Sequence, residues 1–244
     1  MTAPRLCVRW TIGDVLPYGV EALRLSIWGA YRCFGRSARY AVCVHDVPLA
    51  RARAVASPLP GVVDWHAVDA AALPRWLLRR DVSPRAVYRF APVLVDPTRA
   101  ELLLDRRCVM FATPPSVAAW LEGPNPRATV VLDADDGTHG LAMRGAGVGF
   151  DLEEALREAL RESPHPLRTR EDAEQLELAA LGLLEPPREV AAREVAIHAL
   201  GTHGVRLAPP QDAEGRARWD RHVVALHDRL ELPRAVRPVR SHAI

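Results

Sequence analysis

The stretch ELLLDRRCVMF, residues 101–111, is the segment on which the predicted fold and site depend. After Glu101 it has three leucines, as a buried strand does, then places the carboxylate of Asp105 beside the guanidiniums of Arg106 and Arg107, and turns apolar again. Charged groups are rarely buried without partners. The pattern therefore predicts a core strand whose charged segment faces a cavity that accepts an anion.

Strands and helices alternate on either side of this stretch. Apolar segments typical of strands occupy residues 6–12, 40–47, 62–68 and 128–135, and helical patterns occupy residues 19–35, 48–56, 71–80 and 114–121. Gly35 is a typical helix terminator after the first of these helices. The alternation predicts an α/β fold with a mainly parallel sheet that is flanked by helices on both faces.

Three acids follow predicted strands. Asp46, Asp105 and Asp135 each lie at or near the carboxyl end of a strand. Ligands of open α/β sheets bind beyond this edge, so the three acids mark the edge at which we expect the functional site.

The second half of the chain predicts a helical or mixed portion. Helices are expected at residues 151–163, with Asp151 as N-cap, and at 171–184, followed by a strand near 194–200. Residues 208–219 are expected to form a loop, 221–233 a strand or a helix, and 236–244 a flexible basic tail. Residues 1–235 are predicted to form one domain.

Composition excludes several classes of function. The formal net charge of +2 argues against partners such as nucleic acid or an anionic membrane surface, and no apolar run reaches the length of a membrane span. All 32 basic residues are arginine, which excludes Schiff-base chemistry and a Walker A lysine. The four cysteines show no CxxC pairing and are interpreted as reduced core thiols, so a cytoplasmic protein is expected.

The order of these segments resembles the nucleotide-sugar glycosyltransferases of the GT-A fold, in particular galactosyltransferase- and glycogenin-like enzymes. The local similarity is greatest in VYRFAPVLVDPTRAELLLDRRCVMFATPPSVAAWL, residues 87–121. Residues 149–160 and 171–181 also resemble bacterial proteins of this kind, and residues 221–233 resemble the HxxG segment of the family. The resemblance implies a nucleotide-binding half at 1–140 and an acceptor-side half at 141–235.

The resemblance also implies roles for individual residues. Asp105 matches the first acid of the DxD motif, Arg89 matches the basic residue that faces the diphosphate, and His222 is a weak match for the histidine that completes the metal site. Three residues at the first two strand ends would lie near the base and ribose of the nucleotide: Trp10, Thr11 and Asp46.

The sequence departs from the family at Arg107, which stands where the second acid of DxD is expected. Two carboxylates of that motif hold a divalent cation such as Mn²⁺ or Mg²⁺ on the diphosphate. With Asp105 followed by Arg106 and Arg107, two consequences stay open. In one, arginine replaces the metal and pairs with the diphosphate directly, while Asp105 holds the arginines or sugar hydroxyls. In the other, nucleotide-sugar binding has been lost.

Other candidate residues lie in VVLDADDGTHG, residues 130–140. Asp133 and Asp135, with His139 nearby, form a local DxD that would hold a cation. Alternatively, Asp135 or Asp136 orients or deprotonates an acceptor hydroxyl, or the segment is an ordinary turn. The glycine-rich residues 143–150 are interpreted as a loop that approaches a ligand. The absence of GxSxG and HExxH motifs argues against a serine hydrolase and a histidine-rich metal hydrolase.

The sequence thus supports one leading hypothesis and two alternatives. The first is a glycosyltransferase whose partners are a nucleotide sugar and a small-molecule or peptide acceptor, with a homodimer left open. The second is a catalytically silent relative that serves as a binding or assembly protein. The third is an unrelated α/β enzyme whose metal binds the acids of residues 133–137.

Overall fold

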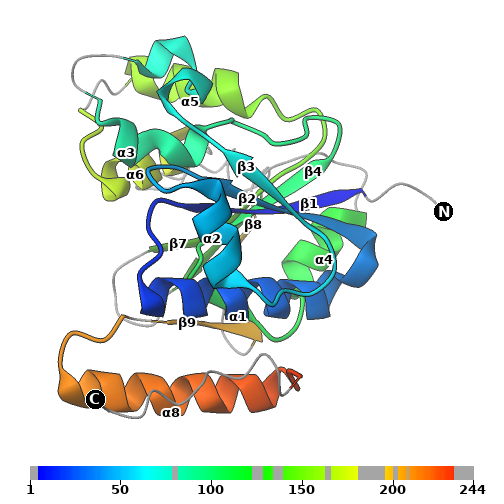
Figure 1. Ribbon diagram of the computed structural model, residues 1–244. Coiled ribbons are helices and arrows are strands. Elements are labelled where there is room, and N and C mark those ends of the chain that lie inside the picture. Colours follow the sequence, from blue (N-terminus) through cyan, green and yellow to red (C-terminus); the bar gives the residue numbers. More distant parts are fainter. Residues whose placement is uncertain are drawn as a thin grey trace.

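The computed structural model describes residues 5–78, 82–122, 129–133, 140–162, 166–180, 196–199, 203–207 and 209–233. Its centre is a seven-stranded sheet with the order β3-β2-β1-β4-β7-β6-β8 (Figure 1). The strands are β1 (Leu6–Ile12), β2 (Ala38–Val44), β3 (Val63–Ala67), β4 (Ala100–Leu104), β6 (Thr129–Asp133), β7 (Gly140–Ala146) and β8 (Ala196–Ala199).

The sheet is mainly parallel, as the sequence predicted. β1 pairs in parallel with β2 and β4, β2 with β3, and β6 with β8, whereas β7 runs antiparallel to β4 and β6. The chain moves outward from β1 to β3 and then returns to place β4 on the other side of β1. The strand order therefore reverses between β1 and β4, which is where α/β sheets open a crevice for ligands.

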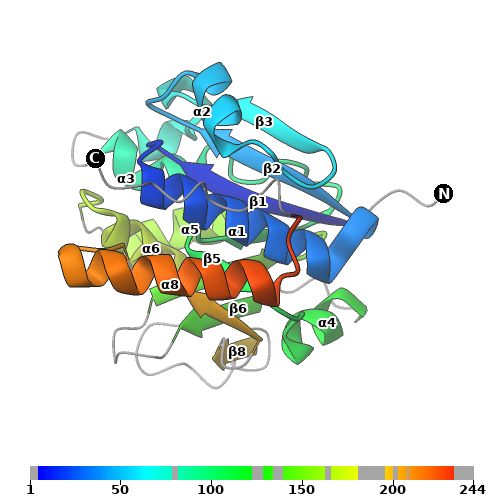
Figure 2. The same cartoon turned by 60° about the horizontal axis from the view of Figure 1, so that its bottom comes forward.

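Side chains of β1 alternate between two helical layers. Val8 and Trp10 face the layer of α1 (Pro17–Phe34), α2 (Leu49–Ala56) and α4 (Pro115–Glu122). Arg9 faces the layer that holds α3 (Pro84–Val87), α5 (Leu152–Glu162) and α6 (Arg170–Ala180). Figures 1 and 2 show these two groups of helices on opposite faces of the sheet.

Helix α1 lies where the sequence predicted a helix, and the residues at its two ends show what sets its limits. Pro17 stands in its first turn, and Gly35 ends it with a φ of 54°, a value that favours glycine. Within the helix, a Cβ on Gly29 would lie 2.5 Å from the carbonyl oxygen of Met110. Because glycine has no side chain, α1 packs directly on the backbone at Met110.

The prediction of one continuous strand at residues 101–111 was wrong. β4 ends at Leu104, residues 105–107 turn, and β5 (Cys108–Met110) pairs antiparallel with β9 (Gly204–Arg206) in a separate two-stranded sheet. The amide of Cys108 donates to the carbonyl of Asp105 at 2.9 Å and closes this turn. The charged trio thus occupies a turn at the edge of the main sheet, not the middle of a strand.

Three further local predictions were wrong. The expected glycine loop at 143–150 is largely strand β7, because its pairing with β4 and β6 outweighs the low strand propensity of glycine. The loop expected at 208–219 gives way to helix α8 (Ala213–Arg229), whose start is capped by Asp212 accepting from the amide of Gly215 at 2.6 Å. The helix expected at 71–80 is replaced by two short 3₁₀ turns on either side of Pro74.

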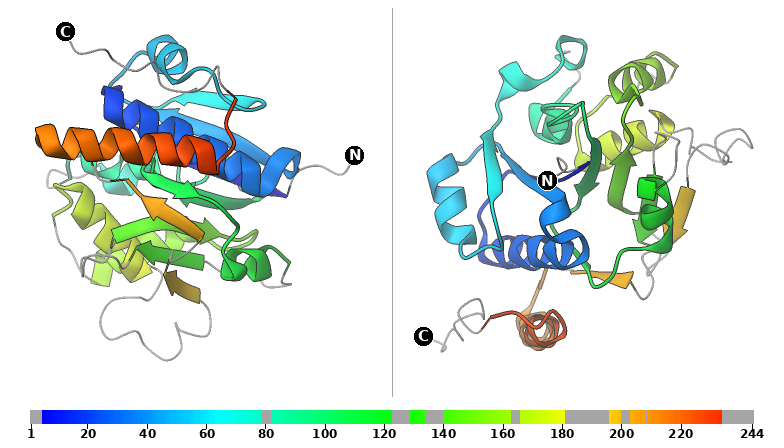
Figure 3. Two further views of the ribbon diagram at one scale, coloured as in Figure 1. Left: turned by 90° about the horizontal axis from the view of Figure 1, so that it is seen from below. Right: turned by 90° about the vertical axis from the view of Figure 1, so that its right-hand side faces the viewer.

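Helix α8 forms an outer layer of the molecule. It runs alongside α1 beyond the small β5–β9 sheet (Figures 1 and 3). Its apolar side, which includes Trp219, Val223 and Leu226, packs with Leu25 of α1 and Val109 of β5. Among the described residues, no helix is both long and apolar enough to cross a lipid bilayer.

Candidate functional site

A cavity of about 440 Å³ opens at the C-terminal edge of β1, β2 and β4. Its walls come from residues 11–14 at the end of β1, residues 45–46 after β2 and residues 103–106 at the end of β4. Side chains of three elements on the α6 face complete them: Arg85, Arg89 and Arg170. The cavity therefore lies at the reversal of strand order, the position at which a doubly wound sheet binds its ligand. Asp46 and Asp105, predicted from separate strand ends, both line it.

Asp105 is the centre of a cluster of guanidiniums. Its side chain is 0% exposed, and its carboxylate accepts the backbone amide of Arg107 at 2.8 Å. The Arg107 guanidinium lies 3.3 Å from Oδ2 and that of Arg206 lies 3.5 Å away, while Arg170 makes a direct hydrogen bond to the same oxygen. Since each guanidinium has several N–H donors, one carboxylate leaves much of their donor capacity free.

The pKa of Asp105 follows from this environment. Burial alone would raise the pKa of the carboxyl, but the charges of Arg170 and Arg107, together with the Arg107 amide, hold it well below its usual range. Asp105 is therefore an anion at any physiological pH. Its negative charge holds Arg107, Arg170 and Arg206 next to one another.

A divalent cation does not fit at Asp105. Mg²⁺ and Mn²⁺ require several oxygen ligands, whereas both oxygens of this carboxylate already accept hydrogen bonds from guanidinium or amide groups. A metal cation at this position would be repelled by the guanidiniums around Asp105, which are also positive. The described part of the chain also holds no group of three or more acidic, histidine or cysteine side chains placed to bind a metal ion.

Arg106 also lines the cavity. Its guanidinium pairs with Asp14 at 2.8 Å and lies against Gly19, where a Cβ would approach it to 3.0 Å. Of residues 105–107, Asp105 and Arg106 line the cavity, and Arg107 pairs with Asp105. Arg107 is not among the residues that line this cavity.

Arg89 lines the cavity but is largely neutralised. Its side chain is 12% exposed and pairs with Glu174 at 3.0 Å and with Glu177 at 2.6 Å, both on α6. Glu174 also pairs with Arg170 at 2.8 Å, which connects Arg89 to the Asp105 cluster.

These pairs belong to one continuous network beneath the cavity. It continues from Glu177 to Arg144 at 2.5 Å, from Arg144 to Glu101 at 3.8 Å, and from Glu101 to Arg9 at 3.3 Å. The network joins six arginines to four carboxylates: Arg9, Arg89, Arg107, Arg144, Arg170 and Arg206, with Glu101, Glu174, Glu177 and Asp105. The surplus of positive charge lies at the Asp105 end, because three arginines meet one acid there.

The end of β2 contributes a second group. Asp46 has a φ of +59°, which is uncommon for a residue with a side chain, and its carboxylate pairs with Arg85 at 2.8 Å. His45 stacks on Tyr88 with ring centroids 4.3 Å apart and fills the space that a Cβ on Gly13 would occupy. Burial lowers the pKa of His45 below its usual value, although the neighbouring Asp46 opposes the shift.

The remaining predicted residues lie in different places. Thr11 lines the cavity, whereas Trp10 is 0% exposed, donates its Nε1 proton to Ser26 at 2.8 Å and packs in the core. His222 lies on α8 and lines a second cavity. The predicted catalytic acids Asp135 and Asp136, together with His139 and the tail, lie outside the described residues.

Sequence reasoning missed His45, Arg170 and Arg206. His45 adjoins Asp46 at a predicted strand end, so the same argument about strand ends would have found it. Arg170 and Arg206 carry no local signal, because they come within reach of Asp105 only through the placement of α6 and β9.

No protein-family model matches the chain, and comparison with curated protein sequences gives no match. Solved structures do match. The galactosyltransferase LgtC in complex with donor and acceptor sugar analogues has a TM-score of 0.50 at 13% identity, covering 94% of this chain and 98% of that one. The inositol-1-phosphate CTP transferase from T. maritima has a TM-score of 0.51 at 10% identity, covering 95% and 98%. The glycosyltransferase GlyE of Streptococcus pneumoniae TIGR4 has a TM-score of 0.45 at 9% identity, and the match spans 80% of this chain but only 45% of that one.

The first two of these structures match nearly the whole length of both chains, and they define the class of fold. The protein has the α/β architecture of the GT-A-like nucleotide-diphospho-sugar transferases, with a mostly parallel sheet flanked by helices. The fold class predicted from the sequence is confirmed, and the resemblance is confirmed at the level of the fold.

Proposed function

We propose that the protein binds a nucleoside-diphosphate sugar in the cavity at the C-terminal edge of the sheet and transfers the sugar to an acceptor without a metal ion. The observation that carries the proposal is the surplus of guanidinium groups around Asp105 at the reversal of strand order. The proposal keeps the cytoplasmic location, the nucleotide sugar and the small-molecule or peptide acceptor predicted from the sequence.

The chemical demand of such a transfer is the charge that develops on the departing diphosphate. Arg170 and Arg106 line the cavity and are assigned to the diphosphate oxygens, because planar guanidiniums pair with phosphate through parallel hydrogen bonds. Asp105 is shared by Arg170, Arg107 and Arg206, so the three guanidiniums carry more charge than the carboxylate and keep a positive excess for the ligand. Asp105 thereby holds the arginines in place, in the position where a DxD acid would hold a cation.

The rest of the cavity is assigned to the nucleoside end of the donor. β2 and β4 lie on either side of β1, so their ends are about 10 Å apart. A ligand whose diphosphate lies at Arg170 extends across Thr11 toward Asp46, whose carboxylate can accept from sugar hydroxyls. Arg89 supports Arg170 through Glu174, which both of them bind.

A second candidate function is a binding or assembly protein that retains the cavity without catalysis. It is favoured by the saturation of Asp105, which leaves that carboxylate unable to act as a base. Turnover distinguishes the two functions, because only the transferase converts a nucleotide sugar that it binds.

The test is a thermal-shift screen of nucleoside-diphosphate sugars with manganese and with EDTA, followed by detection of released nucleoside diphosphate. We expect at least one nucleotide to raise the melting temperature equally in both conditions, and Arg107→Ala to weaken its binding because the cluster around Asp105 then loses one of its three positive charges. Arg161→Gln serves as a matched control, since this arginine is 65% exposed on α5 and pairs with Glu154. Binding without turnover supports the silent relative. Binding that EDTA abolishes contradicts the metal-free proposal, and no binding of any nucleotide sugar contradicts the transferase and favours the assembly protein.

A further inference from the structure

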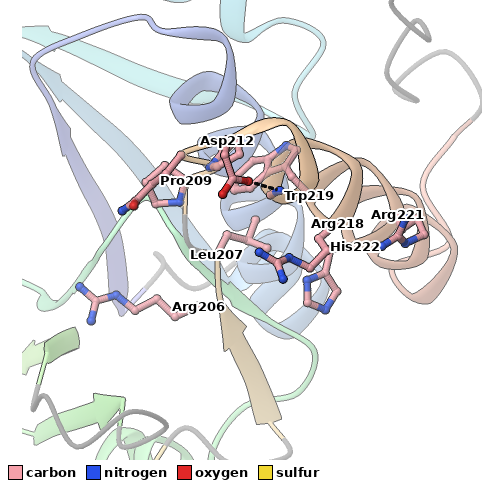
Figure 4. Close-up of a pocket in the computed structure, with 11 residues that line it drawn as sticks. Arg206, Leu207, Pro209, Asp212, Arg218, Trp219, Arg221 and His222 are labelled. Carbon is pink, nitrogen blue, oxygen red and sulfur yellow. Dashed lines mark hydrogen bonds between the residues drawn. The ribbon is translucent and has the colours of Figure 1, made fainter.

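A second cavity, of about 630 Å³, lies between the end of β9 and the first turns of α8. Figure 4 shows Arg218 and His222 extending from α8 to the same side, next to Leu207, while Arg206 extends in the opposite direction. This volume falls within the range of small-molecule sites, which is roughly 300–1,000 Å³. The cavity is separate from the one that Asp105 lines, and the proposed function does not use it.

The base of this cavity is apolar. Leu207 and Trp219 are 2% and 7% exposed, and Pro209 and Pro210 complete the wall. The indole of Trp219 is fixed by an edge contact with Tyr18, with ring centroids 5.4 Å apart. A ring or another apolar body can therefore pack here without first ordering the wall.

The rim is cationic. Arg218, Arg221 and His222 all line the cavity from α8, and neither Arg221 nor His222 forms an ion pair with a described acid. Arg218 pairs with Glu214 at 3.2 Å, but this pair is exposed and contributes little. The one acid of the lining, Asp212, accepts from the helix N-terminus through the amide of Gly215. Positive charge is thus in excess, and the ligand it favours is an anion.

Arg206 connects this cavity to the candidate donor site. It lines the second cavity, yet its guanidinium lies 3.5 Å from Asp105. Its Nε is buried without a hydrogen-bond partner among the described residues. One side chain therefore lines the second cavity and belongs to the arginine cluster around Asp105.

We infer that the second cavity binds a small molecule in which a carboxylate or phosphate group is attached to a ring or apolar body. Arg218, Arg221 and His222 contact the anionic group, and Trp219 and Leu207 contact the body. The site stands on its own geometry and does not require the proposed function. If that function holds, the ligand is the acceptor, because Arg206 brings it beside the donor cavity.

The test is calorimetric titration of the full chain with phenyl phosphate, phenylacetate and inorganic phosphate. We expect phenyl phosphate or phenylacetate to bind more tightly than inorganic phosphate, because only these two have a ring. The double substitution Arg218→Gln with Arg221→Gln is expected to weaken that binding at least tenfold, since it removes two charges from exposed positions without disturbing the core. Arg161→Gln on α5 is the matched control and should leave it unchanged.

A nucleoside diphosphate distinguishes this site from the donor cavity. We expect the double variant to bind a nucleoside diphosphate as the wild type does. No binding of either ring-bearing probe, or binding that the double variant retains in full, overturns the inference. A nucleoside diphosphate whose binding falls in parallel with that of phenyl phosphate shows one common site, which also overturns it.

Discussion

Replacing Asp105 with asparagine removes the carboxylate from the centre of the arginine cluster and keeps the size of the side chain. The carboxylate is 0% exposed and faces Arg107, Arg170 and Arg206, whose side chains are 27%, 43% and 22% exposed. Removing one partner of a buried ion pair costs about 3–5 kcal/mol. Because Arg170 is partly in solvent, we expect the lower end, a loss of about 3 kcal/mol in the free energy of unfolding.

For a chain of this length such a loss lowers the melting temperature by about 6–12 °C, which scanning calorimetry measures directly. The control is Asp64→Asn, since Asp64 and its partner Arg39 are 38% and 42% exposed and their pair should contribute less than about 1 kcal/mol.

The same variant tests whether the cluster accepts anions. Without the carboxylate, three guanidiniums lack their common partner, so added pyrophosphate should stabilise Asp105→Asn more than the wild type. At one hundred times its dissociation constant the ligand would restore about 2.7 kcal/mol. The reasoning is refuted if Asp105→Asn has the same melting temperature as the wild type, or if pyrophosphate raises both melting temperatures by the same amount.

Three other predictions concern the fold and the charge network. Gly29→Ala should lower the free energy of unfolding by about 1–3 kcal/mol in urea titrations, because its Cβ would meet the carbonyl oxygen of Met110 at 2.5 Å; unchanged stability would show that α1 can shift. Glu177→Gln leaves two buried guanidiniums short of a countercharge and should cost about 3 kcal/mol, whereas Glu154→Gln on the exposed face of α5 should cost less than about 1 kcal/mol; equal effects would contradict the network. The folded pKa of Asp105 is lowered, so its stabilisation is present above the unfolded-state pKa of about 3.9 and is lost as pH falls toward the folded value. The stability difference between wild type and Asp105→Asn should therefore be constant from pH 7 to about pH 5 and shrink in stronger acid, and a difference that shrinks above pH 5 would contradict the pKa direction.

The alternation of apolar strands with helices predicted the architecture because it is a local signal. Periodicity, the glycine at the end of α1 and Asp151, whose side chain accepts the amide of Glu154 at 2.9 Å, are each readable within a few residues. The same reasoning placed Asp46 and Asp105 at one edge of the sheet, since the carboxyl ends of parallel strands meet there.

Local reasoning failed where tertiary pairing decides the structure. Residues 102–104 and 108–111 are apolar alike on either side of the charged residues, yet β5 leaves the main sheet because β9, almost one hundred residues later, pairs with it. Arg170 and Arg206 reach Asp105 by the same kind of long-range placement. Spacing within the sequence could not have predicted either contact.

The central claim is that guanidiniums, and not a metal ion, hold a nucleoside diphosphate at the C-terminal edge of the sheet. Its most direct test is calorimetric titration, in EDTA, of wild type and Arg170→Gln with the nucleoside diphosphate of the donor that the screen identifies. We predict that the wild type binds with the same affinity in EDTA and in manganese, and that Arg170→Gln binds about 10- to 100-fold more weakly, as expected for loss of a charged hydrogen bond. Binding that requires manganese, or equal affinity of the two proteins, would contradict the claim.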